Sequence, residues 1–308
     1  MGLERFADED GSDGADSDGA GSDGAGSDGN EESSVSIEMI LRCEDSLEGI
    51  FTAIYDAFVY KNRMEQPYTD SIQIAIGEGG NLSLFAREIS VVTDADKVYK
   101  TVHTIQNRLG YSVYDTLLCA LCHFAEDRGS AVLGYLVRAF AKGKSVSEHL
   151  SDPYVMRVME LSRKVCNERQ RFYGFLRFQL VPMGQLDGLA EAGAIPGGEK
   201  GILWAQMEPK CNLVPLMMEH FSDRYPNEHF IIYDPIRKLA AVHEAYHACV
   251  LVMGQDLSLS RGEGDYIEEL WKHYFASVEI KARHNERCQQ NMMPVWYRKH
   301  MPELTPTR

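Results

Sequence analysis

Apolar residues recur along most of the chain at two spacings, one typical of strands and the other of helices. Alternation over residues 35–43 predicts a strand, the helical spacing after Asp45 predicts a helix, and a weaker alternation predicts a second strand at 71–76. Helical spacing, with capping residues before it and glycines after it, then recurs over 93–150. We therefore expect an N-terminal helical bundle in that region.

The second half of the chain alternates between the two spacings. Asp152 followed by Pro153 predicts a helix start, because a proline at the first helical position forfeits no needed hydrogen bond. Further helices are expected at 214–225 and 265–282, and strands at 175–181, 202–207, 230–233 and 239–242. Helices and strands are only partly interleaved, and several strands are joined too briefly for parallel crossovers. The pattern therefore predicts an α+β fold with a mainly antiparallel sheet packed with helices.

The first 34 residues differ from the rest in composition and charge. They repeat a Gly-Ser-Asp-Gly-Ala theme with almost no large apolar side chain, and they hold eleven acidic residues and one arginine. Such a segment cannot offset its own ordering entropy, so we predict a disordered acidic tail at 1–34 and a single α+β domain at 35–308. The tail carries 10 of the 15 net negative charges, so the predicted domain is only mildly acidic.

Composition limits the classes of protein to which the chain can belong. The hydrophobic fraction of 44% and the charged fraction of 25% are those of an ordinary globular protein. No stretch approaches the apolar length that a membrane span needs, and no basic-then-apolar signal peptide begins the chain. The seven cysteines are scattered and mostly inside apolar segments, which favours reduced, buried thiols over a disulfide framework. We therefore expect a cytoplasmic protein without a membrane partner.

Arginines and aromatic residues are interspersed in the segment ERQRFYGFLRF, residues 168–178. Arg171 and Arg177 flank aromatic rings there, and guanidinium groups beside ring surfaces suit phosphates and unstacked bases. Residues 157–177 hold six basic and two acidic residues, and residues 281–300 hold five and one. Two local basic patches therefore remain on a mildly acidic domain, and such patches set phosphate affinity.

A structural role for the same arginines is the alternative. The aromatic rings would then belong to the core, and the arginines would pair with the carboxylates of Glu168, Glu208 or Asp234. Glu208, His220 and Asp234 would form an acid/base or metal site if they converged at one end of a sheet. His220 lies among apolar residues of a predicted helix, which favours a hydrogen-bonded structural histidine instead.

Several segments, in the same order, resemble a bacterial family of DNA metabolism proteins whose function is unknown. The segments are 168–178, 204–237, LWKHYF at 270–275, Arg283-His284-Asn285 and MPVWYRKHMPE at 293–303, and the resemblance spans roughly residues 36–303. Members of that family are usually encoded beside a radical SAM protein of DNA modification or repair. The resemblance therefore implies a role in DNA metabolism or repair, with a radical SAM protein and DNA as partners. Family members often carry a histidine where this chain has Gln170, and if that histidine is an essential proton carrier, its replacement argues against catalysis by this chain.

The resemblance and the residue pattern lead to two hypotheses about function, and whether the protein is an enzyme stays open. In the first, the protein binds nucleic acid and acts with the radical SAM partner, through phosphate or partner contacts of Arg171, Arg177, Arg224, Arg237, Arg283 and Asn285. In the second, the domain is an enzyme acting on nucleic acid, with Glu208, His220 and Asp234 as catalytic acid/base or ligand groups. No cofactor is predicted.

One short motif favours a third function. His243, Glu244 and His247 spell H-E-x-x-H, which on a helix would place two imidazoles one turn apart for the zinc of a metallopeptidase. The flanking runs at 239–242 and 248–253 are typical of strands, on which the two imidazoles would diverge. The zinc peptidase is therefore the least favoured of the three hypotheses, and no metal site is predicted.

Overall fold

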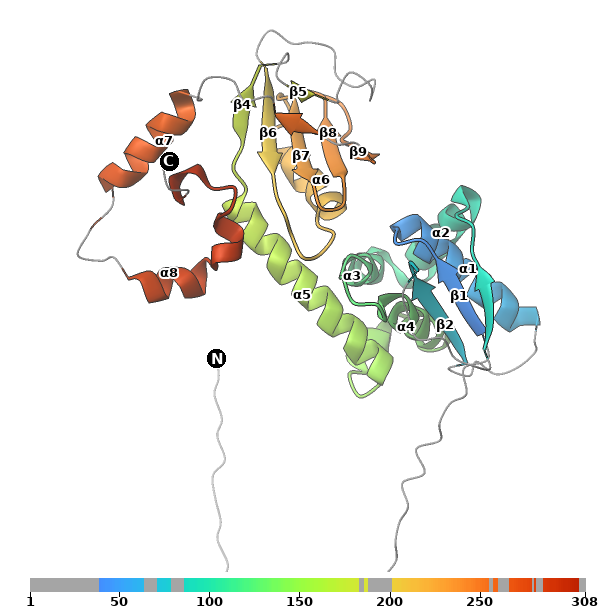
Figure 1. Cartoon of the computed structure of the whole chain (residues 1–308). Helices are drawn as coiled ribbons and strands as arrows, with labels where there is room; N and C mark the ends of the chain where they lie inside the picture. The colour runs from blue at the N-terminus through green and yellow to red at the C-terminus, as the bar shows by residue number, and fades with distance from the viewer. Residues whose placement is uncertain are drawn as a thin grey trace, which may run out of the picture. The chain divides into compact units, whose positions relative to one another are not determined.

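The computed structural model describes residues 39–63, 71–78, 86–182, 186–187, 201–254, 257–259, 266–278, 280 and 285–304. All of them belong to the unit Val35–Arg308. The predicted disordered tail at 1–34 lies outside the described residues. Figure 1 shows how the described helices and strands are arranged along the chain. The described part of the chain has eight α-helices, and none of them is long and apolar enough to cross a membrane.

The first sheet is entirely parallel. Its strands are β1 (Met39–Cys43), β2 (Ile72–Ile76) and β3 (Arg87–Ser90), in the order β2-β1-β3. Helix α1 (Leu47–Arg63) connects β1 to β2, which is the strand–helix–strand unit that a parallel pair requires. β1 lies in the middle of the sheet, so both of its edges are paired.

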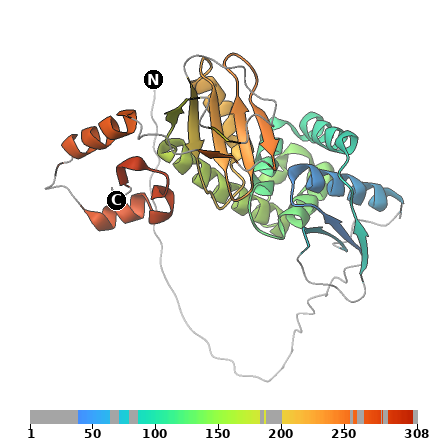
Figure 2. The same ribbon diagram turned by 45° about the horizontal axis from the view of Figure 1, so that its top comes forward.

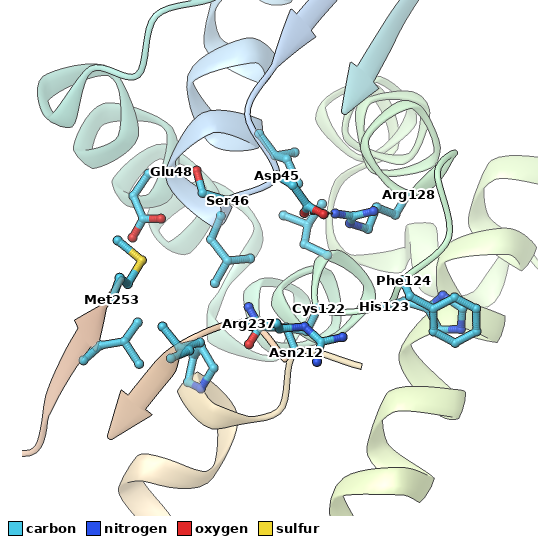
Figure 3. Close-up of a pocket in the computed structure, with 16 residues that line it drawn as sticks. Asp45, Ser46, Glu48, Cys122, His123, Phe124, Arg128, Asn212, Arg237 and Met253 are labelled. Carbon is cyan, nitrogen blue, oxygen red and sulfur yellow. Dashed lines mark hydrogen bonds and ion pairs between the residues drawn. The ribbon is translucent and has the colours of Figure 1, made fainter. Parts of the chain in front are cut away.

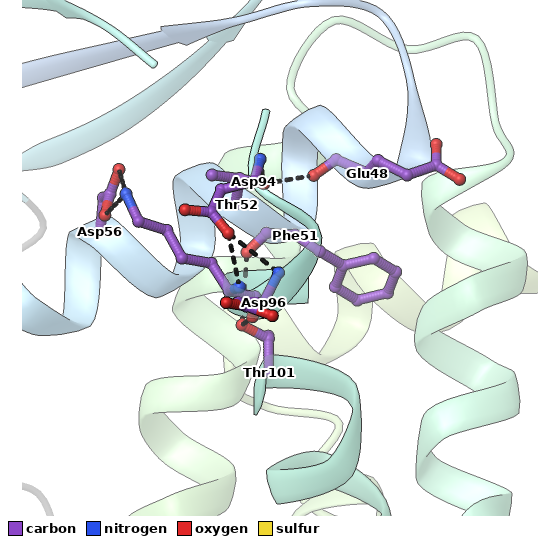
Figure 4. Close-up of polar contacts among 8 residues, drawn as sticks. Glu48, Phe51, Thr52, Asp56, Asp94, Asp96 and Thr101 are labelled. Carbon is purple, nitrogen blue, oxygen red and sulfur yellow. Dashed lines mark hydrogen bonds and ion pairs between the residues drawn. The ribbon is translucent and has the colours of Figure 1, made fainter. Parts of the chain in front are cut away.

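Polar contacts join α1 to α2 (Ala95–Leu109), as Figure 4 shows. The carboxylate of Asp94 caps α2 by accepting hydrogen bonds from the backbone N–H groups of Asp96 (2.9 Å) and Lys97 (3.2 Å). The hydroxyl of Thr52 on α1 accepts a hydrogen bond from the backbone N–H of Asp94 (3.2 Å). Because capped N–H groups no longer need water, the start of α2 packs closely against α1.

Helices α3 (Tyr111–Leu121), α4 (Arg128–Lys142) and α5 (Pro153–Phe175) follow, with the short 3₁₀ helix η1 (Gly143–Glu148) between the last two. α5 packs against both α3 and α4, and α4 also packs against β2. Asp152 caps α5 through the backbone N–H of Tyr154, as the Asp-Pro pair predicts.

The second sheet has five strands and mixed pairing (Figure 2). The strands are β4 (Gln179–Val181), β6 (Ile202–Gln206), β7 (Phe230–Asp234), β8 (Leu239–His243) and β9 (Val250–Met253), paired in that order. β6 and β7 are parallel and are joined through α6 (Val214–Arg224), whereas the other three pairs are antiparallel.

Short elements complete the described part of the chain. β5 (Leu186–Asp187) pairs with β10 (Ser258–Leu259) in an antiparallel ribbon. The C-terminal elements are α7 (Tyr266–Val278), α8 (Glu286–Met292), and the 3₁₀ helices η4 (Val295–Arg298) and η5 (Pro302–Leu304).

The predicted mainly antiparallel sheet is wrong. One sheet is parallel throughout and the other is mixed, so the chain has a mixed α/β fold rather than the predicted α+β fold. The cause is that the helices α1 and α6 each lie between two strands, and a helix between strands supplies the crossover that parallel pairing needs. The segment at 175–181 also differs, because α5 continues to Phe175 and only the last three residues form β4.

The two faces of the second sheet bury alternate residues of β7. Phe230 and Ile232 pack on the face covered by α6, and Ile231 and Tyr233 pack on the opposite face with Trp204. Strand side chains point to alternate faces, so a fully buried strand reads as a continuous apolar run. This packing fixes the ends of β6 and β7, from which several of the predicted functional residues emerge.

Candidate nucleic-acid interface

The C-terminal end of α5 and the surface of α6 form a pocket with a volume of about 530 Å³. We call it the aromatic–arginine pocket. Its lining includes the rings of Tyr173, Phe178, Phe221, Tyr225 and Trp271 and the guanidinium groups of Arg177 and Arg224. The pocket therefore joins aromatic side chains and arginines from α5, α6 and α7, elements that are distant in the sequence.

Phe178 holds the aromatic wall of this pocket in place. Its ring makes edge-to-face contacts with Phe221, Tyr225 and Phe230, at centroid separations of 5.4, 5.5 and 6.1 Å. Such contacts stabilise ring pairs beyond the burial of their area. Trp271, by contrast, is 39% exposed, so an incoming ring has access to its surface.

The two arginines of the pocket have different partners. The guanidinium of Arg177 forms an ion pair with Glu303 (2.8 Å), whose side chain is 1% exposed, and it also donates to the backbone oxygen of Gly174 (2.9 Å). Arg224 is exposed and contacts the ring and hydroxyl of Tyr225, with its Nε 3.3 Å from that hydroxyl. Among the described residues that line the pocket there is no carboxylate. Arg224 is therefore the cation available to a ligand, whereas Arg177 is committed to the fold.

Arg171 forms a second cation–aromatic pair on α5. It is exposed, its Nη1 lies 3.3 Å from the hydroxyl of Tyr297, and its guanidinium lies 5.6 Å from the centre of that ring. Tyr297 in turn packs against Phe172 and Phe175. The segment 168–178 therefore mixes both predicted roles, because Phe172 is core and Arg171 is solvent-accessible.

Arg237, which was predicted as a nucleic-acid or partner contact, has structural partners instead. It pairs with Asp234 (2.8 Å), whose side chain is 0% exposed, and it donates to the backbone oxygens of Pro209 (3.0 Å) and Lys210. Asp234 also accepts from the backbone N–H groups of the turn that follows β7. The Asp234–Arg237 pair therefore connects the loop after β6 to the turn after β7 through hydrogen bonds and an ion pair.

Glu168 fastens the same loop from the other side. It is buried on α5, and its carboxylate accepts hydrogen bonds from the backbone N–H groups of Lys210 (2.8 Å) and Cys211 (3.0 Å). A carboxylate that satisfies two backbone donors positions the loop without pairing with an arginine. Of the three carboxylates that the alternative interpretation named as arginine partners, Glu168 therefore binds backbone N–H groups among the described residues.

Glu208 lies in the loop after β6, at the carboxyl ends of the parallel strands. It forms an ion pair with Lys299 (2.5 Å) and accepts a hydrogen bond from His300 (3.2 Å). Burial raises the pKa of the Glu208 carboxyl, but the hydrogen bond and charge of Lys299 outweigh burial, so the pKa lies below its ordinary value. Burial disfavours the charged form of His300 and so lowers its pKa, although the charge and hydrogen bond of Glu208 oppose that shift. Glu208 is therefore an ionised carboxylate held by a cation at neutral pH.

The three predicted catalytic groups have separate surroundings. His220 stacks on Tyr173 at a centroid separation of 3.9 Å, whereas Glu208 binds Lys299 and Asp234 binds Arg237. In the described part of the chain, no hydrogen bond or ion pair joins any two of Glu208, His220 and Asp234. No direct contact among the described residues therefore links the three groups into an acid/base site.

The other predicted residues belong to different surroundings. Asn285 caps α8 by accepting a hydrogen bond from the backbone N–H of Cys288 (3.0 Å), and Arg283 lies outside the described residues. His243 ends β8 in a buried position, with Nδ1 2.9 Å from the backbone oxygen of Glu228, whereas His247 is exposed in the turn that follows. The two imidazoles of the H-E-x-x-H motif therefore do not share a helix face, which removes the geometric basis of the zinc peptidase.

Four residues that matter here were not singled out from the sequence. Trp271 lines the aromatic–arginine pocket, Glu303 holds Arg177, and Lys299 and His300 hold Glu208. All four lie in the segments 270–275 and 293–303, which carry the family resemblance. Their presence in those segments was the available signal. The ion-pair and hydrogen-bond partners of Lys299, His300 and Glu303, however, are 91 or more residues away in the chain.

Comparison with known proteins gives one match. A family model described as "Domain of unknown function (DUF4130)" matches residues 126–303, which include every element that lines the aromatic–arginine pocket. Neither the curated proteins nor the solved structures contain a match.

Proposed function

This chain belongs to the DUF4130 family, and we propose that it binds single-stranded nucleic acid through the aromatic–arginine pocket. The observation that carries the proposal is the lining itself: two guanidinium groups and five aromatic rings, with no carboxylate among the described lining residues. Single-stranded nucleic acid is bound by rings that stack on unstacked bases and by cations that contact the backbone. The cavity of about 530 Å³ is large enough for a base to enter.

Within the proposed site, the residues have separate roles. Trp271 offers the stacking surface, because its ring is partly exposed at the pocket. Arg224 contacts a backbone phosphate, because it is exposed and has no carboxylate partner in the described part of the chain. Arg171, whose contact among the described residues is with Tyr297, extends the cationic surface along α5. Arg177 positions the wall of the pocket and contributes positive potential that Glu303 largely offsets.

Replacing Arg224 with alanine is expected to weaken binding to a single-stranded oligonucleotide by about 10-fold, since one hydrogen bond to a charged group such as a phosphate is worth roughly 1.5–3 kcal/mol. The slope of log K against log salt concentration should fall in magnitude by about 0.7, the value for one phosphate contact on a single strand. Fluorescence anisotropy across a salt series measures both quantities.

Arg108 provides a matched control for this experiment. It is also an exposed arginine over an aromatic ring, 5.0 Å from the centre of Phe140, but it lies outside the pocket and the matched family segment. Arg108→Ala should leave affinity and salt slope unchanged. Equal losses in the two variants, or binding that does not depend on salt, would count against the proposed site.

We further propose that the protein acts in DNA metabolism or repair beside a radical SAM protein, in the cytoplasm. The resemblance of the segments at 168–178 and 204–237 supports this partner, and the free thiols of the described cysteines suit a reducing compartment. The protein is proposed as the binding component, since Glu208 and Asp234 are each neutralised by a cation.

The partner is tested by co-purification. The tagged full-length chain is expected to retain the neighbouring radical SAM protein when both are expressed together. Arg224→Ala should retain it equally well, because that residue is assigned to nucleic acid. Recovery of the tagged chain alone, at salt concentrations that preserve weak complexes, would reject the partnership.

A further inference from the structure

Two cysteine side chains meet between α3 and α5. Sγ of Cys119 on α3 lies 3.6 Å from Sγ of Cys166 on α5, although the two residues are 47 positions apart in the chain. Cys119 is 4% exposed, whereas Cys166 is half-buried. The two helices pack against each other, so both thiols are held by regular structure. Neither cysteine lines the aromatic–arginine pocket, and the pair is therefore independent of the proposed nucleic-acid interface.

The separation of the two sulfurs suits a disulfide better than a metal site. A disulfide bond is about 2.0 Å long, so the sulfurs need to approach by about 1.5 Å to form one. A structural metal site needs four ligands, and a catalytic one needs at least three. Among the residues that the structure describes, no group of three or more histidine, cysteine, aspartate or glutamate side chains could hold a metal ion. The chemistry that fits the pair is therefore oxidation to a disulfide.

Cys166 is the more reactive of the two thiols. Nη2 of Arg169 lies 3.9 Å from its Sγ. The hydrogen bond with Cys119 lowers the pKa of the Cys166 thiol, burial opposes that shift, and the positive charge of Arg169 lowers the pKa further. The same hydrogen bond raises the pKa of Cys119, which keeps its proton. Since the thiolate is the nucleophile, Cys166 is the sulfur that attacks an oxidant, and Cys119 is the sulfur that follows.

The other thiols near the pair lack this activation. Cys122 is 1% exposed, and Figure 3 shows it among the residues that line a separate pocket with a volume of about 190 Å³. Burial raises the pKa of the Cys122 thiol to about 12, and it also raises the pKa of the Cys211 thiol. A buried thiol that stays protonated is inert. In this cluster, Cys166 is therefore the thiol that is both partly accessible and activated.

We propose that Cys166 and Cys119 form a redox-sensitive modification site, which a peroxide converts reversibly into a disulfide between α3 and α5. The sulfur of Cys166 attacks one oxygen of hydrogen peroxide, the O–O bond breaks, and the departing hydroxide takes up a proton to become water. The sulfur of Cys119 then attacks the sulfenic acid at Cys166, and the hydroxyl leaves as water with the proton of Cys119. The two thiols lose two electrons and two protons, and the peroxide is reduced to two waters. A dithiol reverses the reaction by thiol–disulfide exchange.

Peptide mapping of the full-length protein after treatment with hydrogen peroxide tests the site. Trypsin cuts after Arg108, Arg128, Lys164 and Arg169, so the disulfide would join peptide 109–128 to peptide 165–169. We expect this linked pair, two hydrogens lighter than the sum of its parts, and its loss after reduction with dithiothreitol. Oxidation of Cys166 that stops at the sulfenic or sulfinic acid would overturn the proposal, and so would a Cys166 that stays reduced.

Cys119→Ala and Cys122→Ala assign the partner, because both cysteines lie in peptide 109–128. Both are buried at the end of α3, so Cys122→Ala is the matched control. The linked peptides should persist in Cys122→Ala and be absent from Cys119→Ala. The reverse pattern would overturn the proposed pair. Cys288 is exposed, so all of the proteins compared carry Cys288→Ser, which prevents links between molecules through that thiol.

A second measurement keeps the proposal testable if Cys119→Ala does not fold. Fragmentation of the linked peptides from the protein that retains both cysteines locates the bond at Cys119 or at Cys122 directly. Oxidation should also raise the melting temperature by about 5 °C, because the link restricts the unfolded chain, and dithiothreitol should remove the rise. A lower melting temperature after oxidation would show that the bond forms only when the packing of α3 against α5 is disrupted, which would overturn the proposal.

Discussion

Replacing Arg177 with methionine is expected to lower the free energy of unfolding by about 3 kcal/mol, because the substitution leaves a buried carboxylate without its cation. Glu303 is 1% exposed at its side chain, and Arg177 is its ion-pair partner in the described structure. The same guanidinium holds the end of α5 through the backbone oxygens of Gly174 and Leu176. Arg177 was predicted to be a nucleic-acid contact, and this geometry makes it a stabilising residue first.

Urea unfolding of Arg177→Met, Glu303→Gln and the double variant measures the coupling. Glu303→Gln should cost less than Arg177→Met, because it leaves no buried charge, and the double variant should be close to Glu303→Gln alone. Arg157→Met, which breaks an exposed pair with Asp127, should cost less than about 1 kcal/mol. A fully stable Arg177→Met would contradict the structural role and return Arg177 to the set of ligand contacts.

Replacing Asp234 with alanine is expected to lower the free energy of unfolding by about 4 kcal/mol. Its carboxylate, 0% exposed, accepts from the backbone N–H groups of Ile236 (2.9 Å) and Arg237 (3.3 Å) and from the Arg237 guanidinium (2.8 Å). Alanine would leave the two backbone N–H groups of the turn without this acceptor and would remove the carboxylate partner of Arg237, whose guanidinium would still donate to Pro209 and Lys210.

Asp234→Asn separates the turn from the charge. The amide oxygen of asparagine can still accept from the backbone of the turn, so this variant should cost roughly half as much as Asp234→Ala. Thermal unfolding followed by circular dichroism measures both. If Asp234→Ala unfolded at the same temperature as the original protein, Asp234 would not be a structural anchor, and a catalytic role would regain support.

The sequence predicted most individual elements of the fold but not how they pair. The strand and helix at the start of the chain and the strand at 71–76 were all expected, yet their order implies a parallel pair that was not inferred. β3 (Arg87–Ser90) was missed altogether, because three of its four side chains are exposed and it has no apolar alternation. β3 forms through backbone hydrogen bonds to the edge of β1 opposite β2, and the side chains of β3 carry no signal of that pairing.

Burial was predicted less well than periodicity. The helix predicted at 265–282 is present as α7, but its apolar residues Leu270 and Tyr274 are 49% and 58% exposed. A hydrophobic stripe shows which face of a helix prefers contact, and it does not show whether a partner surface is present.

The candidate site was predicted in its residue types but not in its pairing. Exposed arginines beside rings were expected at 168–178, and Arg171 has that arrangement. The distinction between Arg177 and Arg224 depends on Glu303, which lies 126 residues from Arg177 in the chain. Periodicity carries no information about contacts at that separation, so the sequence alone left the alternatives open.

The family match begins at residue 126, two residues before α4, and this boundary cuts through a core. Val132, Leu133 and Leu136 of α4 are fully or almost fully buried in one cluster with Leu41 and Ile74 of the parallel sheet. A fragment excised at that boundary would expose the apolar surface of α4 to solvent and would be prone to aggregate. Any protein that carries only the matched segment must therefore cover this surface with another polypeptide segment.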